Sequence, residues 1–178
     1  MKILGKVLLL LVVALLVAGV GYPLLHEGGH SLAALCAGGA VEDIRLLPTA
    51  SVLCRMPTHP AGIAAVGLGG ILLPPVVAAM MPHRRFWSWF VRYILLSVCL
   101  MSLVFSLVAV GCFQAGSSLP QEDVTQILRY APQSLPYLYP VLMGTLAVVS
   151  LLWARARPLR RWVAFFRDQP PKMHRMCK

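Results

Sequence analysis

Two histidines and a glutamate with the spacing of a zinc-hydrolase motif lie inside an apolar segment of this 178-residue chain. The stretch is His26-Glu27-Gly28-Gly29-His30. On a helix, residues four apart lie about one turn above each other, so His26 and His30 can present two nitrogens to a single Zn²⁺. Glu27 projects about 100° away and can take a proton from an activated water without being a ligand. The stretch predicts a hydrolytic metal site that needs a third protein ligand.

The surroundings of the motif favour this interpretation over a plainer one. Five-residue patterns of this kind arise by chance in soluble helices. Here the histidines could also cap a membrane span at the bilayer interface, with Glu27 facing the headgroups. Ionisable residues at membrane depth are costly, however, and they are functional candidates by default. We therefore favour the metal site.

The composition identifies these surroundings as a membrane. The chain is 58% hydrophobic and 12% charged, which is too apolar for a soluble domain of this length. Four segments are near or above the roughly 20 residues that cross a bilayer as a helix. They cover about 5–25, 61–82, 86–112 and 136–154. We predict an all-α membrane protein, with residues 1–154 as one polytopic core and residues 155–178 as a basic tail.

The net charge of +10 is distributed as in a membrane protein and argues against a nucleic-acid partner. Basic residues lie before the first span, between the second and third, and after the fourth, where eight fall between Arg155 and Lys178. Four spans place these segments on one side, which the positive-inside rule makes cytoplasmic. Both termini are predicted to be cytoplasmic, with the tail against anionic lipid headgroups. Scattered charges without a folded module would give little nucleic-acid specificity.

The first apolar segment allows two interpretations. Two lysines, the apolar run 7–17 and the small residues 18–20 resemble a signal peptide with a cleavage site. The apolar run continues to Leu25, however, which favours an uncleaved span. The aromatic residues between 87 and 93, at the start of the third span, fit an interfacial aromatic belt.

The residues just before the motif predict a separate helical piece for the histidines. Gly19, Gly21 and Pro23 are expected to break or kink the first helix, because proline removes a backbone donor and crowds the preceding turn. A second piece, about 24–38, would then carry the motif. Small residues line its histidine face, which lets neighbouring helices approach and suits a metal shared between helices. Ordinary small-residue packing without a metal would give the same stripe.

The segment after the motif changes in character. Residues 41–56 contain acidic, basic and β-branched side chains and a break at Pro48-Thr49. This pattern predicts a short amphipathic β-hairpin after the zinc-motif helix. An exposed strand edge beside a hydrolytic site could hold an extended polypeptide by strand addition. A surface loop that links two helices is the alternative.

The third ligand must come from a small set, because the chain has only six acidic residues. Glu122 and Asp123 lie between the third and fourth spans, on the same side as the motif by the charge count. From a helix start at 118–120, Asp123 falls on the apolar face and Glu122 points about 100° away. Asp123 is the predicted third ligand, although the helix dipole also favours an acid in a first turn. His59 is the best substitute.

These residues resemble the zinc-binding start of the site-2 protease family of intramembrane metalloproteases, in its small bacterial branch without a PDZ domain. The resemblance is carried by the residues 26–35, Gly38-Gly39, the hairpin-like 41–47, the glycine-rich 65–70, Glu122-Asp123-Val124, Leu128 and 136–144. It implies that His26, His30 and Asp123 bind Zn²⁺ and that Glu27 activates water for peptide-bond hydrolysis.

The resemblance also implies a function and a location. We expect a zinc-dependent intramembrane endopeptidase that hydrolyses peptide bonds of membrane-embedded or membrane-proximal protein segments. Its partners would be the lipid bilayer and a membrane-protein substrate, and its location a bacterial cytoplasmic membrane. The alternative is a non-enzymatic membrane protein: a zinc-binding pseudoprotease, a regulator, or a small transporter subunit. Zinc content separates the transporter from the others, and peptide cleavage separates protease from pseudoprotease.

Overall fold

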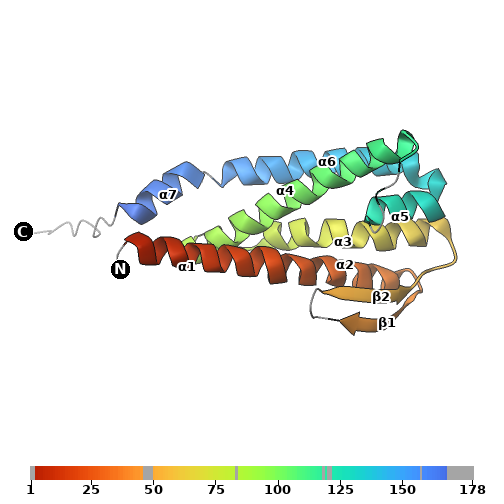
Figure 1. The fold of residues 1–178 in the computed structure, drawn as a ribbon, viewed down its shortest axis with the longest axis horizontal. Coiled ribbons are helices and arrows are strands. Elements are labelled where there is room, and N and C mark those ends of the chain that lie inside the picture. The colour runs from red at the N-terminus through yellow and green to blue at the C-terminus, as the bar shows by residue number, and fades with distance from the viewer. Residues whose placement is uncertain are drawn as a thin grey trace, which may run out of the picture.

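The chain forms an antiparallel bundle of membrane-length helices. The computed structural model describes residues 3–45, 50–82, 84–117, 119, 122–156 and 158–167. In this part of the chain, four helical segments are long and apolar enough to cross a membrane, and successive segments alternate in direction (Figure 1). The predicted all-α membrane fold is confirmed, and the chain is an integral membrane protein. Lys2 and the part of the tail beyond residue 167 lie outside the described residues.

The first membrane segment is one continuous helical run. It consists of α1 (Ile3–Leu16), a π-helical turn (Val17–Gly21) and α2 (Tyr22–Cys36). The irregularity that the sequence predicts near Gly19, Gly21 and Pro23 is thus a π turn and not a break, and the motif-bearing piece, predicted at about 24–38, is Tyr22–Cys36. The π turn loosens the regular hydrogen-bond ladder just where Pro23, in the first turn of α2, has no N–H to contribute. The run can thus pass the proline without ending.

A two-stranded hairpin follows α2, as the sequence predicts. Strand β1 (Ala40–Arg45) pairs antiparallel with β2 (Ser51–Arg55), with Ile44 opposite Val52. The register shifts at a bulge between Val41 and Asp43. Strand β2 lies between β1 and α2 (Figure 1). The outer edge of β2 therefore runs beside the zinc-motif helix, while the predicted break at Pro48-Thr49 lies outside the described residues.

The remaining elements complete the bundle and close its site end. They are α3 (Pro60–Met80), α4 (Phe86–Gln114), α5 (Asp123–Tyr130), a 3-10 turn (Pro132–Ser134), α6 (Leu135–Arg155) and α7 (Pro158–Phe166). The hairpin and α5 lie at one end of the bundle, and α7 lies with the start of α1 at the other (Figure 1). Helix α7 falls within the segment that the sequence assigns to the tail.

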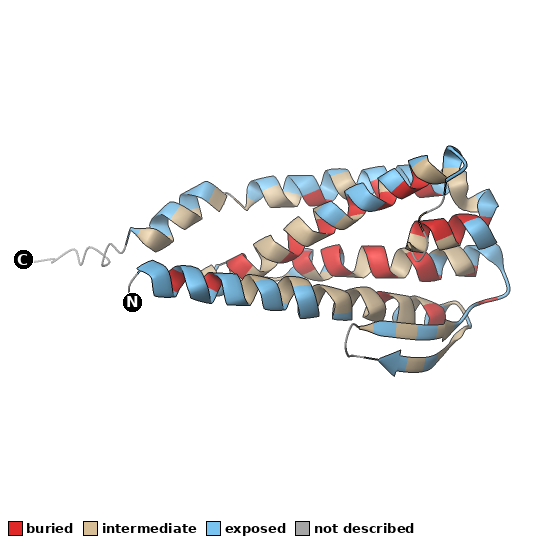
Figure 2. Ribbon diagram, in the orientation of Figure 1, coloured by how far each residue is buried: buried red, intermediate tan, exposed pale blue. Residues whose placement is uncertain are grey.

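Burial is concentrated where α3, α4, α5 and α6 meet. Figure 2 shows buried residues along α3, α4 and α5, whereas α1 is exposed over most of its length. Among the described residues of α1, only Lys6 and Leu10 are buried. An apolar helix with so much exposed side-chain surface suits contact with lipid tails. The protein core that supports the site therefore lies on the α3 side of the motif helix.

Candidate metal centre

Helices α2 and α3 touch through their backbones beside the motif. A Cβ added at Gly29 would overlap the carbonyl oxygen of Gly69, and a Cβ at Gly69 would overlap the carbonyl oxygen of Gly29. Small residues at such a crossing let two membrane helices approach closely. This contact fixes α2, and with it both motif histidines, against α3.

Two further glycines of α3 make room for the site itself. A Cβ at Gly70 would overlap the imidazole of His30, and a Cβ at Gly67 would overlap the side chain of Ile127 on α5. The first glycine admits a ring from α2, and the second admits α5. The glycine-rich stretch 65–70 thus provides space for both helices that contribute to the site.

Three of the predicted site residues converge on one point. The Nε2 atoms of His26 and His30 lie 3.2 Å apart. Asp123 Oδ2 lies 2.9 Å from His26 Nε2, and Asp123 Oδ1 lies 3.4 Å from His30 Nε2. The side chains are 20%, 13% and 27% exposed for His26, His30 and Asp123. Residues 97 positions apart in the chain thus form one half-buried cluster.

The hydrogen bond of His30 determines what this cluster can hold. Its Nδ1 lies 2.8 Å from the backbone carbonyl oxygen of Val66, which can only accept. Nδ1 therefore carries the proton, and in a neutral ring the lone pair of Nε2 faces His26 and Asp123. Two imidazole nitrogens and a carboxylate directed at one point can hold a cation between them.

The spacing of the three ligand atoms fits a zinc ion. Two nitrogens and one oxygen are a donor set that Zn²⁺ commonly takes, with a fourth position left for water. Ligands about 2.0 Å from a tetrahedral ion are roughly 3.3 Å from one another. The three observed separations of 2.9, 3.2 and 3.4 Å lie around that value. The residues present therefore fit the ion that the motif predicts.

The environment of Asp123 favours its ionised form. Burial alone would raise the pKa of this carboxyl group. Hydrogen bonds with His26 and His30 lower the pKa by more than burial raises it, so the pKa lies well below its ordinary value. The Tyr22 ring stacks on the His26 imidazole, with 5.8 Å between centroids. Asp123 is thus available as an anionic ligand at neutral pH.

The residue before Asp123 ties α5 to α4. Helix α5 begins at Asp123, with Glu122 as its N-cap, and not at 118–120 as the sequence suggests; Ser118 and Pro120 lie outside the described residues. Glu122 accepts a hydrogen bond of 2.9 Å from the Thr125 N–H and another of 2.9 Å from the Ser106 hydroxyl. Burial raises the pKa of Glu122, and these two bonds partly offset that rise. The N-cap of α5 and the hydrogen bond from Ser106 of α4 together fix the position of Asp123.

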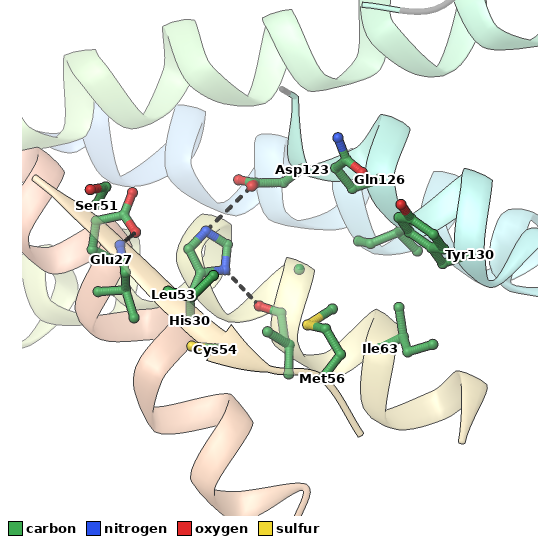
Figure 3. Close-up of a pocket in the computed structure, with 14 residues that line it drawn as sticks. Glu27, His30, Ser51, Leu53, Cys54, Met56, Ile63, Asp123, Gln126 and Tyr130 are labelled. Atoms are coloured by element: carbon green, nitrogen blue, oxygen red, sulfur yellow. Dashed lines mark hydrogen bonds and ion pairs between the residues drawn. The ribbon is translucent and has the colours of Figure 1, made fainter. Parts of the chain in front are cut away.

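Glu27 lies beside the cluster but outside it. Its Oε2 accepts a hydrogen bond of 2.9 Å from the backbone N–H of Val52 in β2 (Figure 3). The sequence places Glu27 near the metal but gives no sign that the hairpin holds its side chain. The signal that could have suggested it is the position of a predicted strand edge next to the motif.

A cavity of about 960 Å³ opens in front of these residues. It is bounded by α2, α3, α5 and β2, and Glu27, His30 and Asp123 line its inner part (Figure 3). Most of its remaining lining is apolar. A second cavity, of about 420 Å³, reaches His26 and Glu27 from between α2, α4 and α5. The cluster is thus accessible from two directions.

The substitute ligand lies elsewhere. His59 precedes α3 as its N-cap and is exposed, with its ring close to Gly62. Among the described residues, the group that could hold a metal consists of His26, His30 and Asp123 alone.

Comparison with known proteins gives one finding. A family model described as Peptidase M50B-like matches residues 3–117, which include the motif, the hairpin, α3 and α4. No curated protein and no solved structure gave a significant match to the chain.

Proposed function

The chain belongs to the Peptidase M50B-like family, and from this premise we propose that it is a zinc-dependent intramembrane endopeptidase. Its substrates would be membrane-embedded or membrane-proximal segments of other proteins. In this proposal His26, His30 and Asp123 are the metal ligands and Glu27 is the general base. The finer assignment rests on two premises. The chain belongs to a family of peptidases, and it is an integral membrane protein.

One observation carries the proposal: the meeting of three ligand atoms from α2 and α5, with a carboxylate next to them. His26, His30 and Asp123 lie within hydrogen-bond distance of one another in pairs. Glu27 is held by β2 beside these residues, where it lines the larger cavity. Ligands, base and space for a polypeptide are the parts that metal-assisted hydrolysis needs.

Bound Zn²⁺ would supply Lewis-acid chemistry, polarising the scissile carbonyl and making water a stronger nucleophile at neutral pH. Glu27 accepts a proton from the attacking water and later returns it to the leaving amine nitrogen as the C–N bond breaks. The Val52 N–H holds one oxygen of the carboxylate and leaves the other to exchange the proton. The Val66 carbonyl keeps the proton of His30 on Nδ1 throughout.

The substrate must be extended at the point of cleavage, because a helical backbone hides its carbonyl groups within the helix. The larger cavity runs along β2, whose outer edge can pair with an extended segment by strand addition. Its apolar lining suits the side chains of a segment that comes from a bilayer. Water can approach through the smaller cavity between α2, α4 and α5.

The test compares two glutamates of the same region. Glu27→Gln keeps the shape and removes the proton acceptor, so zinc content should stay near one per chain while cleavage falls at least about 100-fold. Glu42→Gln in β1 is the matched control, because Glu42 pairs with Arg55 at 2.9 Å, away from the ligands. Metal content comes from mass spectrometry, and cleavage from a screen of single-span peptides in detergent. Wild type that binds zinc and cleaves nothing would indicate a pseudoprotease, and wild type without zinc would refute the proposal.

We propose further that both termini are cytoplasmic, in a bacterial cytoplasmic membrane, with the basic tail against anionic headgroups. The support is that α7 and the start of α1 lie at the end of the bundle opposite the hairpin and α5 (Figure 1). Reporter fusions should place Arg84 and Lys178 inside the cell and Glu122 outside. A reporter at Lys178 that is active only outside would overturn this orientation.

A further inference from the structure

One polar side chain of the larger cavity has no part in the proposed chemistry. Gln126 lines the cavity from α5, three residues after Asp123, and it lies between Asp123 and Tyr130 in Figure 3. On a helix, Asp123, Gln126, Ile127 and Tyr130 share one face. Gln126 therefore stands on the wall of the cavity that also presents the third ligand.

Gln126 is half-buried, and its carboxamide has no hydrogen-bond partner among the described residues. Its backbone N–H donates to the Glu122 carbonyl oxygen. The amide faces the cavity and is open to a group that enters it. Around it, the wall is formed by apolar side chains such as Ile127 and Ile63. A ligand with both a donor and an acceptor would satisfy this amide.

The opposite wall of the cavity is a strand edge. Val52 directs its N–H away from β1, to Glu27. Because backbone groups alternate along a strand, Cys54 directs its N–H and C=O to the same side. An extended segment paired with this edge would present its own outer N–H and C=O groups toward the wall formed by α5. The cleft is thus a strand edge on one side and an unpaired carboxamide on the other.

We propose that Gln126 is a substrate-positioning residue, which hydrogen-bonds a backbone peptide group of the extended segment on the side away from β2. This inference rests on the proposed peptidase function. A carboxamide carries an acceptor oxygen and a two-hydrogen donor, the same pair of functions as a peptide group. The contact is made to the backbone, so it fits many sequences. It also sets the segment one helical turn from Asp123.

The first experiment separates binding from chemistry. The probe is a fluorogenic single-span peptide in detergent micelles, chosen because wild type cleaves it and Glu27→Gln does not. Gln126→Met keeps the length of the side chain and removes its hydrogen bonds, so KM should rise about tenfold with kcat near wild type. Zinc content and thermal stability should not change. Gln133→Met, on an exposed turn outside the cavity, is the matched control and should match wild type.

The second experiment asks whether Gln126 contacts the backbone itself. Ester bonds replace successive peptide N–H groups of the probe, avoiding the scissile bond. With wild type, one ester position should raise KM about tenfold through loss of the Gln126 contact. With Gln126→Met, the same ester should cause no further rise in KM. Esters that break pairing with β2 should raise KM by the same factor in both proteins. Such non-additivity at one position is not expected from a merely structural residue.

The outcomes distinguish this inference from the proposed function. If no single-span peptide is cleaved by zinc-loaded wild type, the peptidase function fails. If wild type cleaves the probe and Gln126→Met has the same KM, the positioning role of Gln126 is wrong while the peptidase function stands. If Gln126→Met loses zinc or stability together with activity, Gln126 supports the fold and the inference is also overturned.

Discussion

The two ends of the bundle are built from different interactions. At the site end, single hydrogen bonds and ion pairs join distant elements, as between Asp123 on α5 and His26 on α2. At the opposite end, aromatic rings pack into a cluster in which Trp89 and Phe90 are each only 1% exposed. Helix α7 covers that cluster, with Trp162 and Phe165 against the start of α4.

This difference separates function from stability along the bundle axis. A directional contact at the site end fixes the position of one residue and by itself buries little apolar surface; the apolar burial there comes from Val124, Ile127 and Leu128 of α5. The aromatic end buries large side chains and holds α1, α4 and α7 together. Changes to the polar contacts around His26, His30 and Asp123 should therefore act mainly on metal affinity, and changes to the aromatic cluster should act on the free energy of unfolding. The predictions below test that separation in order of their expected effect on the metal.

The largest effect is expected at Asp123, the proposed third ligand. Asp123→Ala should lower zinc affinity more than roughly 100-fold, because outer partners of a ligand already cost 10–100-fold. His59→Ala, on the exposed N-cap of α3, should bind zinc like wild type. Competition with a chelator of known affinity measures both. If Asp123→Ala bound zinc fully and His59→Ala lost zinc binding, the third ligand would be His59 at the start of α3 and not Asp123.

A smaller effect is expected at Gly70, which touches the ligand but cannot bind a metal. An added methyl group would overlap the His30 imidazole and push it from its place. Gly70→Ala should weaken zinc binding about 10–100-fold. Gly111→Ala is the control, because a Cβ at Gly111 meets nothing within 4 Å. Equal zinc affinity in the two variants would show that the α2 and α3 contact has more room than the structure gives it.

The parts of the site that depend on spacing along one helix, or on a local change in residue types, could be predicted from the sequence. The histidine spacing follows from helical periodicity. The hairpin follows from the change from apolar to charged and β-branched residues after Gly39. The pairing of Asp123 with the motif follows from the distribution of charge across the spans, which requires only that four helices alternate in direction. These predictions depend on local period and on topology.

Apart from the pairing of Asp123 with the motif, the contacts between elements that are distant in the chain could not be predicted. Nothing local indicates that the N–H of Val52 holds Glu27, or that Gly70 makes room for His30. The aromatic residues 87–93 fit an interfacial belt by sequence, yet Trp89 and Phe90 are buried beneath α7. Hydrophobic periodicity identifies the apolar face of a helix but does not indicate which other element packs against that face.

The smallest effect on the metal is expected at Trp162, at the far end of the bundle. Its ring packs on Trp89 and Phe90, with centroids 6.1 and 5.5 Å away. Because it is half-buried, Trp162→Ala should lower the free energy of unfolding by about 2 kcal/mol, less than a fully buried tryptophan. Leu159→Ala, on the same helix and 81% exposed, should change it little. Zinc affinity should equal that of wild type in both variants, since distant sites contribute independently. Thermal unfolding in detergent and chelator competition measure the two quantities. A loss of zinc affinity in Trp162→Ala comparable to that of Gly70→Ala would mean that the two ends are coupled and that function and stability are not separated along this bundle.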